Sequence, residues 1–426
     1  MGDVLAVVGL RPHRVAWLEA IGHRCGFEVA AVLPYELVRK AERYDIEALL
    51  DQARRRLAET GATGIATYWD FPSSCLVPIL AEERQLPTPG LRAAVCFEHK
   101  YWSRLLQREV APEDTPEVVP VDVFDTSAAA EPPLPFPFWL KPVKSYAGHL
   151  GFRIDSADDY RHALEALREG IGRLGVPFQH VLDRLRDVPP EVAEVGGTGA
   201  IAEQIVDGQQ CTLEGHVCGG EVDIHGIFSI ERAEDGSTFT HYLYPSHLPD
   251  AARARMRTIA TGLMEAAGYD DAAFNIEFFV DDATGRTWIL EVNPRISQEH
   301  SHLMDWVDGA TNLEVMAQIA LGRRPTLLVG EGASNVAAKF FVREWQDAVV
   351  TSVPDEDRIR SLEQRHAPCA IEVTVHEGDR LSELPDQEAY SYIVAYVYLG
   401  RATEAELHED YDTVVAELGL EVTAAG

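Results

Sequence analysis

A strand pair carrying Glu277 and Glu291 constrains this chain more than any other part of its sequence. Residues 274–280 read FNIEFFV, residues 288–293 read WILEVN, and a turn at Asp281–Arg286 separates them. In such a hairpin Glu277 lies opposite Glu291, and Asn293 shares its face because side chains alternate along a strand. Like charges on one face destabilise a sheet unless a cation offsets them. Oxygen ligands of this kind hold Mg²⁺, which commonly accompanies phosphates, so we expect a magnesium and phosphate site here.

Size and charge limit the classes of protein that remain. The chain has 426 residues, of which 46% are hydrophobic and 25% charged, which is typical of a globular protein with two to four domains. Lys and Arg number 37 and Asp and Glu 69, so the formal net charge is −32. A surface this acidic repels nucleic acids and anionic membranes, so we expect neither as a partner.

Cysteine usage and the N-terminus indicate a cytoplasmic protein. The six cysteines contain no CxxC pair, and scattered thiols in a long chain are typical of a reducing compartment. The first residues, MGDVLAVVGLRPHR, have no basic start ahead of the apolar run. We therefore expect no signal peptide, and no apolar run is long enough to span a membrane.

The N-terminal third alternates apolar strands with helices. Strands are expected at 4–8, 27–33 and 64–69, with helices at 15–25 and 45–60, which indicates a small parallel α/β layer. The dinucleotide fingerprint GxGxxG does not follow the first strand.

Polar side chains that suit phosphate binding follow in the next part of the chain. A helix is predicted over 92–109 and carries Lys100, and the strand 138–143 (FWLKPV) buries Lys141 among apolar neighbours. An unpaired charge there is costly, which favours a ligand or an acidic partner for Lys141. The loop 144–151 (KSYAGHLG) has small residues whose backbone N–H groups can surround an anion.

A mobile loop is predicted at 191–199, and a strand at 200–206 ends in Asp-Gly. From residue 334 onward, strands near 335–342, 370–375 and 391–399 and a helix at 404–418 suggest a small α+β unit.

Four features follow one another along the chain: Lys100, Lys141 with its Ser/Gly loop, the strand 203–208 and the motif Glu-Val-Asn-Pro-Arg at 291–295. In this order they resemble the ATP-grasp superfamily. The similarity covers about residues 1–320, in the carboxylate–amine ligase and biotin carboxylase-like branch. It implies an α/β and α+β fold in which two β-rich layers clasp ATP. The implied units are a Rossmann-like domain (1–90), a helical linker segment (91–137), a lid (138–207), a catalytic subdomain (208–325) and a small C-terminal α+β subdomain (326–426).

The resemblance also implies roles for individual residues. Glu277, Glu291 and Asn293 would hold Mg²⁺, or Mn²⁺ in its place. Arg295, Lys141 and Glu299 would be catalytic, with Arg295 stabilising the transferred phosphoryl group and Glu203 reaching the adenine amine. Gln210 stands where many relatives have a glutamate that meets the ribose. The implied ATP-binding residues are Lys100, Lys141, Ser145, Gly148, Glu203, Gln204, Ile205 and Gln210.

Several of these residues also have plainer interpretations. Lys100 could be an ordinary exposed helix lysine, Arg295 could serve only as a counter-ion, and Glu299 with His300 could cap the following helix.

The expected activity is a ligase that activates a carboxylate with ATP as an acyl phosphate and joins it to an amine, releasing ADP and phosphate. Its substrates would be small molecules such as amino acids, and the chain would form a homodimer. A bicarbonate-activating carboxylase and an ATP-binding scaffold without turnover remain alternatives, and the identity of both substrates stays open.

Overall fold

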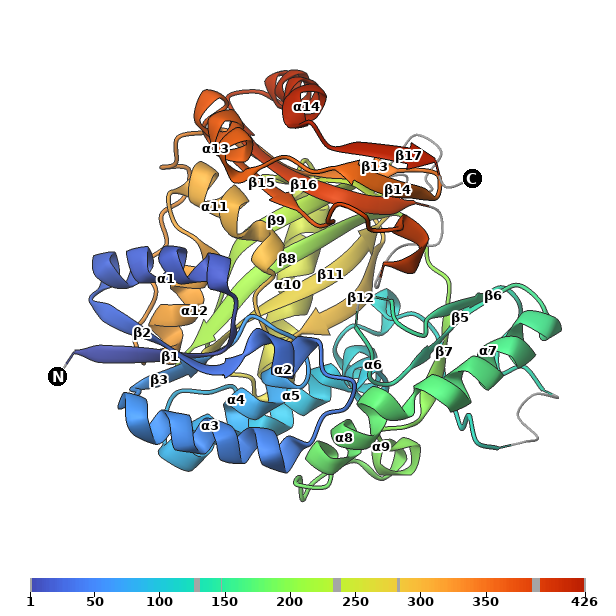
Figure 1. Ribbon diagram of the computed structural model, residues 1–426. Helices are drawn as coiled ribbons and strands as arrows, with labels where there is room; N and C mark the ends of the chain where they lie inside the picture. Colours follow the sequence, from blue (N-terminus) through green and yellow to red (C-terminus); the bar gives the residue numbers. More distant parts are fainter. Residues whose placement is uncertain are drawn as a thin grey trace.

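The computed structural model describes residues 2–125, 131–146, 148–232, 239–281, 284–384 and 391–424. Three lobes surround one large sheet (Figure 1): an N-terminal lobe in blue, a lid in green and a C-terminal lobe in orange and red. Within the described residues, no helix is both long and apolar enough to cross a membrane. All six cysteines lie in the described part of the chain, and none of them forms a disulfide there.

The strands are β1 (Asp3–Leu10), β2 (Phe27–Pro34), β3 (Gly64–Ala66), β4 (Val118–Val121), β5 (Phe138–Pro142), β6 (Phe152–Ile154), β7 (Ala200–Gln204), β8 (Gln209–Cys218), β9 (Glu221–Arg232), β10 (Phe239–Tyr244), β11 (Ala272–Val280), β12 (Thr287–Asn293), β13 (Val336–Glu344), β14 (Ala348–Ser352), β15 (Cys369–Val373), β16 (Tyr392–Arg401) and β17 (Glu421–Ala424).

The helices are α1 (Pro12–Cys25), α2 (Tyr35–Arg39), α3 (Ile46–Thr60), α4 (Ser73–Arg84), α5 (Leu91–Glu98), α6 (Lys100–Val110), α7 (Ala157–Gly170), α8 (Gly172–Leu182), α9 (Pro190–Val195), α10 (Asp250–Ala267), α11 (Ser301–Asp308), α12 (Asn312–Ala320), α13 (Glu356–Arg365) and α14 (Glu404–Leu418). Short 3₁₀ turns are η1 (Pro112–Asp114), η3 (Gln298–His300) and η4 (Leu381–Glu383).

The N-terminal lobe is a parallel α/β layer, as its alternating pattern predicts. Its three strands pair in the order β2-β1-β3. Helix α3 begins where the Asp45 carboxylate accepts a hydrogen bond from the N–H of Ala48 (3.0 Å), and it ends at Gly61, whose φ of +65° suits glycine. These local signals explain why the sequence indicated this region correctly.

The single helix predicted over 92–109 is wrong, because His99 divides it into α5 and α6. The His99 backbone is extended (φ −89°, ψ 99°), and its Nδ1 accepts a hydrogen bond from the N–H of Trp102 (3.2 Å). The imidazole therefore caps α6 in the manner of an Asn or Asp. The break places Lys100 in the first turn of α6, where its N–H donates to the carbonyl of Val143 in the lid (2.8 Å).

The lid is a four-stranded antiparallel sheet in the order β4-β7-β5-β6. In the pairing of β5 with β7, Lys141 lies opposite Ile201 and Trp139 opposite Glu203. The loop predicted at 191–199 is wrong in part, since Pro190–Val195 forms α9. A proline in its first turn begins this helix and Gly196 ends it, a short signal that an apolar pattern does not reveal.

The central sheet has eight strands in the order β12-β11-β8-β9-β10-β13-β16-β15. Its apolar face carries residues such as Leu213, Phe274 and Ile276, which pack with α10 in one buried core. Alternate residues of β8 and β11, among them Thr212 and Glu277, lie on the opposite, polar face. The sheet continues past residue 325, so the last two expected units share one sheet.

Removing residues 334–426 should prevent formation of a stable catalytic lobe. Strand β10 would lose its partner β13, and Phe228, Leu243 and Tyr244 would lose apolar neighbours from the C-terminal strands. We expect residues 1–333 to aggregate or to unfold without a cooperative transition, measured by size-exclusion chromatography and thermal unfolding against the full chain. A monomeric fragment with a sharp transition would contradict this expectation.

Candidate active site

The two acidic side chains of the hairpin meet as their spacing predicts. Glu277 on β11 lies opposite Glu291 on β12, and Asn275 lies opposite Asn293. The Glu277 carboxylate accepts hydrogen bonds from Asn293 Nδ2 (3.4 Å) and from Gln210 Nε2 (3.2 Å). Gln210 therefore contacts the acidic pair, and its expected contact with a ribose stays a prediction. The side chains of Gln210 and Glu277 lie on the polar face of two neighbouring strands, β8 and β11, which brings them together.

The two carboxylates have opposite pKa shifts. Burial and the nearby Glu291 charge raise the pKa of Glu277. Burial would also raise the pKa of Glu291, but its ion pair with Lys100 and the charges of Lys141 and Lys144 lower it below the ordinary value. The charges of Arg295 and Lys100 also act on Glu277, but they do not outweigh burial and the Glu291 charge.

The donor set at this pair suits a hard cation that shares its ligands with phosphates. The described residues contain no group of three or more His, Cys, Asp or Glu side chains arranged to hold a metal. Two carboxylates and the Asn293 amide would supply part of the shell of Mg²⁺, which usually completes it with phosphate oxygens and water. A divalent cation would also remove the like-charge repulsion that raises the pKa of Glu277.

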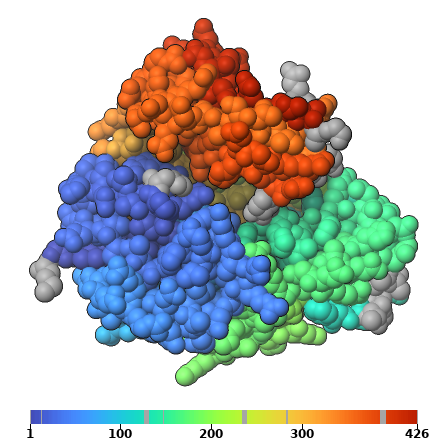
Figure 2. All heavy atoms as spheres, viewed as in Figure 1, coloured from blue at the N-terminus to red at the C-terminus, as the bar shows by residue number. Residues whose placement is uncertain are grey.

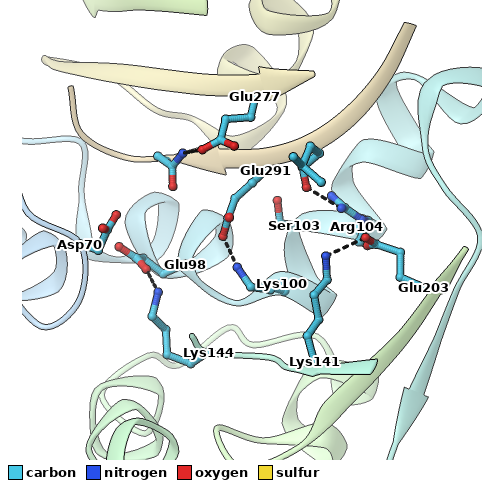
Figure 3. Close-up of polar contacts among 12 residues, drawn as sticks. Asp70, Glu98, Lys100, Ser103, Arg104, Lys141, Lys144, Glu203, Glu277 and Glu291 are labelled. Atoms are coloured by element: carbon cyan, nitrogen blue, oxygen red, sulfur yellow. Dashed lines mark hydrogen bonds and ion pairs between the residues drawn. The ribbon is translucent and has the colours of Figure 1, made fainter. Parts of the chain in front are cut away.

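Three lysines approach the acidic pair from the lid and from α6 (Figure 3). Lys100 forms an ion pair with Glu291, Lys141 Nζ lies 2.7 Å from Glu203 Oε1, and Lys144 forms an ion pair with Glu98. The lysines of β5 and its loop point toward the central sheet, so cations and acids face each other between two β-layers. Lys100 is largely buried, which excludes the interpretation of an ordinary exposed helix lysine.

The Glu203 carboxylate contacts two cations of the protein, and its expected contact with an adenine amine stays a prediction. Its carboxylate, 2% exposed, accepts from Arg104 Nε (2.6 Å) and from Lys141 Nζ (2.7 Å). These cations outweigh burial and lower the pKa of Glu203 to about 2. Arg104 also donates to the carbonyl of Leu290 in β12 (2.6 Å), so this triad joins the lid to the central sheet.

Lys144 is a site residue that sequence reasoning did not include. It is 3% exposed, and its ammonium lies over the rings of Phe71 and Phe178 at 5.9 and 6.0 Å. Burial would lower its pKa, but the Glu98 and Asp70 carboxylates outweigh that effect and raise it. Its position directly before the Ser/Gly loop was the available signal.

The loop after β5 is held against the N-terminal lobe. Ser145 is buried, and the Tyr146 ring packs in the N-terminal core with the Arg39 guanidinium 4.0 Å from its centre. Gly148 has a φ of +72°, which an L side chain rarely adopts. Residue 147 lies outside the described residues, and phosphate contacts from Ser145 and Gly148 stay a prediction.

The segment after β7 follows the expected hinge position. The side-chain oxygen of Gln204 accepts a hydrogen bond from the backbone N–H of Glu117 (3.2 Å), and the backbone N–H of Gln204 donates to the carbonyl of Glu117 (2.9 Å). Gln204 also lines a cavity of about 510 Å³ together with Val118 and Trp288. Ile205 follows it in the chain. Nucleotide contact by either residue stays a prediction.

Arg295 is fixed by the N-terminal lobe. Its Nε donates to Oδ1 of Asp70 (2.7 Å), which follows β3 and was not among the expected residues. The charges of Arg295, Lys144 and Arg39 outweigh burial and lower the pKa of Asp70 to about 2. Asp70 lies 225 positions from Arg295, so only tertiary structure reveals the pair.

Glu299 and His300 lie toward the C-terminal strands. Glu299 forms an ion pair with Lys339 of β13. His300 Nδ1 lies 2.8 Å from Glu214 Oε1, and its ring stacks on Phe228 with centroids 3.8 Å apart. The polar run 297–300 therefore does more than cap α11, because its side chains contact β8, β9 and β13. Whether Glu299 is catalytic stays a prediction.

Comparison with known proteins agrees with this arrangement. Residues 244–327 match the family model for the ATP-binding domain of the carbamoyl-phosphate synthase L chain. The carbamoyl phosphate synthase large chains of Thermus thermophilus and Clavibacter michiganensis are each 32% identical over 107 residues, which cover 25% of this chain and 10% of theirs. The chain thus spans about a tenth of the length of the curated relatives it matches.

Solved structures match over nearly the whole chain. An L-amino acid ligase from Bacillus licheniformis matches with a TM-score of 0.71 and 18% identity, covering 100% of this chain and 99% of its own. The biotin carboxylase domain of 2-oxoglutarate carboxylase from Hydrogenobacter thermophilus matches with a TM-score of 0.65 and 14% identity, covering 99% and 92%. These similarities establish the fold.

The lid and the central sheet have the fold of these solved structures, and residues 244–327 are similar to the ATP-binding domain of the carbamoyl-phosphate synthase L chain. That segment contains β11, β12 and both acids.

Replacing Glu203 by Gln should destabilise the protein by roughly 3–5 kcal/mol, because it removes the negative charge that pairs with the Arg104 and Lys141 cations. The measurement is denaturant unfolding. Glu194→Gln, an exposed glutamate on α9, is the matched control and should change stability by less than about 0.5 kcal/mol. Equal stability of both variants would show that Arg104 and Lys141 do not depend on this carboxylate.

The stability of the parent should fall in acid through the same carboxylate. Its folded pKa of about 2 lies below the ordinary 4.5, so its contribution is complete above pH 4.5 and is lost as the pH falls toward 2. We expect a smaller loss of melting temperature from about pH 5 to about pH 3 in Glu203→Gln than in the parent. Parallel pH curves would refute this assignment.

Proposed function

We propose that this protein is an ATP-dependent ligase that activates a carboxylate as an acyl phosphate and joins it to an amine, releasing ADP and phosphate. The observation that carries the proposal is the acidic pair Glu277–Glu291 facing three lysines between two β-layers. Such a layer of opposite charges suits a polyphosphate held with a divalent cation. The fold shared with an L-amino acid ligase supports the same reaction class.

Each group near the acids has a role that follows from its charge. Glu277, Glu291 and Asn293 would hold Mg²⁺, which offsets phosphate charge when bound. Lys100, Lys141 and Lys144 would position the phosphates as point charges with several donors each. Arg295, oriented by Asp70, would stabilise negative charge on the transferred group and then on the tetrahedral intermediate.

The reaction needs positioning more than covalent help from the protein. A substrate carboxylate oxygen attacks the γ-phosphorus of ATP, and ADP leaves. The amine then attacks the acyl carbon, loses a proton, and phosphate leaves as the amide forms. A bound geometry that excludes water matters because an acyl phosphate hydrolyses readily.

A bicarbonate-activating reaction is the second candidate. The ion pair between Glu299 and Lys339 favours it, because it places an acid and a base beside the polar run that follows Arg295. ADP release that depends on bicarbonate, and not on organic acids or amines, would support this candidate. ATP binding without ADP release under all these conditions would support a scaffold.

Finer features belong to the same proposal. Small molecules, with amino acids first among them, are proposed as substrates, and Mn²⁺ is proposed as a substitute for Mg²⁺. We also propose a cytoplasmic homodimer, since one matching structure is described as a dimer. Light scattering of the purified chain tests the oligomeric state.

Arg295→Ala and Glu291→Ala should each lower substrate-dependent ADP release at least a hundredfold, because each removes charge at the phosphoryl group. ADP release is measured by a coupled assay with a panel of amino acids. The matched control is Arg55→Gln, an exposed arginine on α3, which should keep the parent rate. Far-UV circular dichroism checks that the variants fold. A folded variant that turns over at the parent rate would show that the site is assigned wrongly.

A further inference from the structure

A second charged cluster lies beyond the polar run 297–300, where the N-terminal and C-terminal lobes meet. It consists of Arg11 and Arg14 at the end of β1 and the start of α1, with Lys339 of β13, Glu299 and Glu372 of β15. Arg11 Nη1 lies 3.5 Å from Glu372 Oε1, and Lys339 forms an ion pair with Glu299. We call these five residues the Arg14 cluster. The proposed ligase reaction uses none of these five residues, and the bicarbonate candidate uses only the Glu299–Lys339 pair.

Arg14 has an unsatisfied donor in this cluster. Its residue exposure is 6%, and its buried Nε has no hydrogen-bond partner in the described structure. Its Nη2 makes a long contact to the carbonyl of Gln298 (3.4 Å), and its guanidinium lies 5.0 Å from the centre of the Trp17 ring. A buried donor without a partner is costly, which indicates that a ligand acceptor completes its hydrogen bonding.

Lys339 is the second buried cation of the cluster. It is 1% exposed, and its ammonium lies 3.6 Å from the centre of the Tyr396 ring. Burial, only partly offset by Glu372, lowers its pKa to about 7, and the nearby Arg14 charge adds to the shift. A bound anion would offset both effects.

The cluster is open to solvent on one side. The side chains of Arg11, Glu372 and Glu299 are 27%, 35% and 38% exposed, whereas Arg14 and Lys339 lie at the base. Figure 2 shows the surface hollowed where the blue, orange and green parts meet, with darker yellow atoms of the central part at the bottom. Glu299 of the cluster follows Arg295 of the proposed site by four positions, and Arg14 contacts the carbonyl of Gln298 between them.

We propose that the Arg14 cluster binds a second substrate carboxylate, one that is not activated by ATP, and that the acceptor amino acid supplies it. The proposal rests on the ligase function, in which the activated carboxylate lies at Arg295 and cannot also occupy Arg14. A guanidinium suits a carboxylate because its N–H groups match the two oxygens. With Lys339 protonated, as a bound anion favours, three cations and two carboxylates have a net charge of +1, which matches a single carboxylate better than a phosphate dianion.

The test compares acids with their amides. Glycine, L-alanine and β-alanine are offered as acceptors beside glycinamide and L-alaninamide, and hydroxylamine traps the acyl phosphate as a hydroxamate without needing a carboxylate. Binding of the same compounds is followed by thermal shift, which requires no turnover. The variants are Arg14→Gln, Arg14→Lys and Lys339→Met, with Arg55→Gln as the control.

We expect the parent to bind the acids at least tenfold more tightly than the amides. Arg14→Gln and Lys339→Met should reduce this preference, and they should lower the ratio of the ligated product to the hydroxamate at least tenfold. Arg14→Lys should recover part of the binding preference and part of the product ratio. The same comparison is made with the substrate that ATP activates, using dicarboxylic acids and their monoamides. If the preference for an acid over its amide depends on a second carboxylate of that substrate, the site binds a carboxylate but its assignment to the acceptor is wrong.

Two outcomes separate this inference from the proposed function. A parent protein that traps hydroxamate yet binds acids and amides equally would overturn the Arg14 inference and keep the ligase. A parent protein that prefers acids in binding but never forms hydroxamate would overturn the ligase and keep the carboxylate site. Equal losses of hydroxamate and amide in the Arg14 variants would show a structural role only.

Discussion

The repulsion between Glu277 and Glu291 is the constraint around which the other lobes are arranged. Two carboxylates in register on neighbouring strands are unfavourable in a half-buried position, and hydrogen bonds from Asn293 and Gln210 offset only part of that cost. The lid supplies Lys141 and Lys144, and α6 supplies Lys100, so positive charge from other elements surrounds Glu291. The position of the lid over the central sheet therefore adds positive charge beside Glu291.

Ion pairs between lobes then fix the charged side chains of the candidate site. Arg104 and Lys141 share Glu203, and Arg104 also contacts the β12 backbone, so one buried triad sets the distance between the two sheets. Asp70 orients Arg295 from the N-terminal lobe. Buried pairs of this type add little net stability but leave a costly charge when one partner is lost, which makes them sensitive to geometry. Each lobe thus contributes a group that the others need.

The interpretation of the sequence succeeded where a signal was local. Period-two alternation placed Glu277 against Glu291, and the Asp45 cap with Gly61 marked both ends of α3. It failed at His99, because an imidazole acting as an N-cap has no distinct composition signal. It also did not reveal the pairing of Glu203 with Arg104, because the two residues lie 99 positions apart in the chain. Lys144 and Asp70 were missed for the same reason.

The sequence by itself determined the strand pair with its acids, the parallel N-terminal layer and the order of charged motifs that resembles the ATP-grasp superfamily. These features depend on side-chain alternation, caps and spacing, which neighbouring residues decide. Only the tertiary structure decided which cation meets which acid, that the C-terminal strands extend the central sheet, and that Arg14 and Lys339 share one cluster. Those pairings join residues far apart in the chain, and electrostatic energy depends on distances in space that spacing along a sequence does not contain.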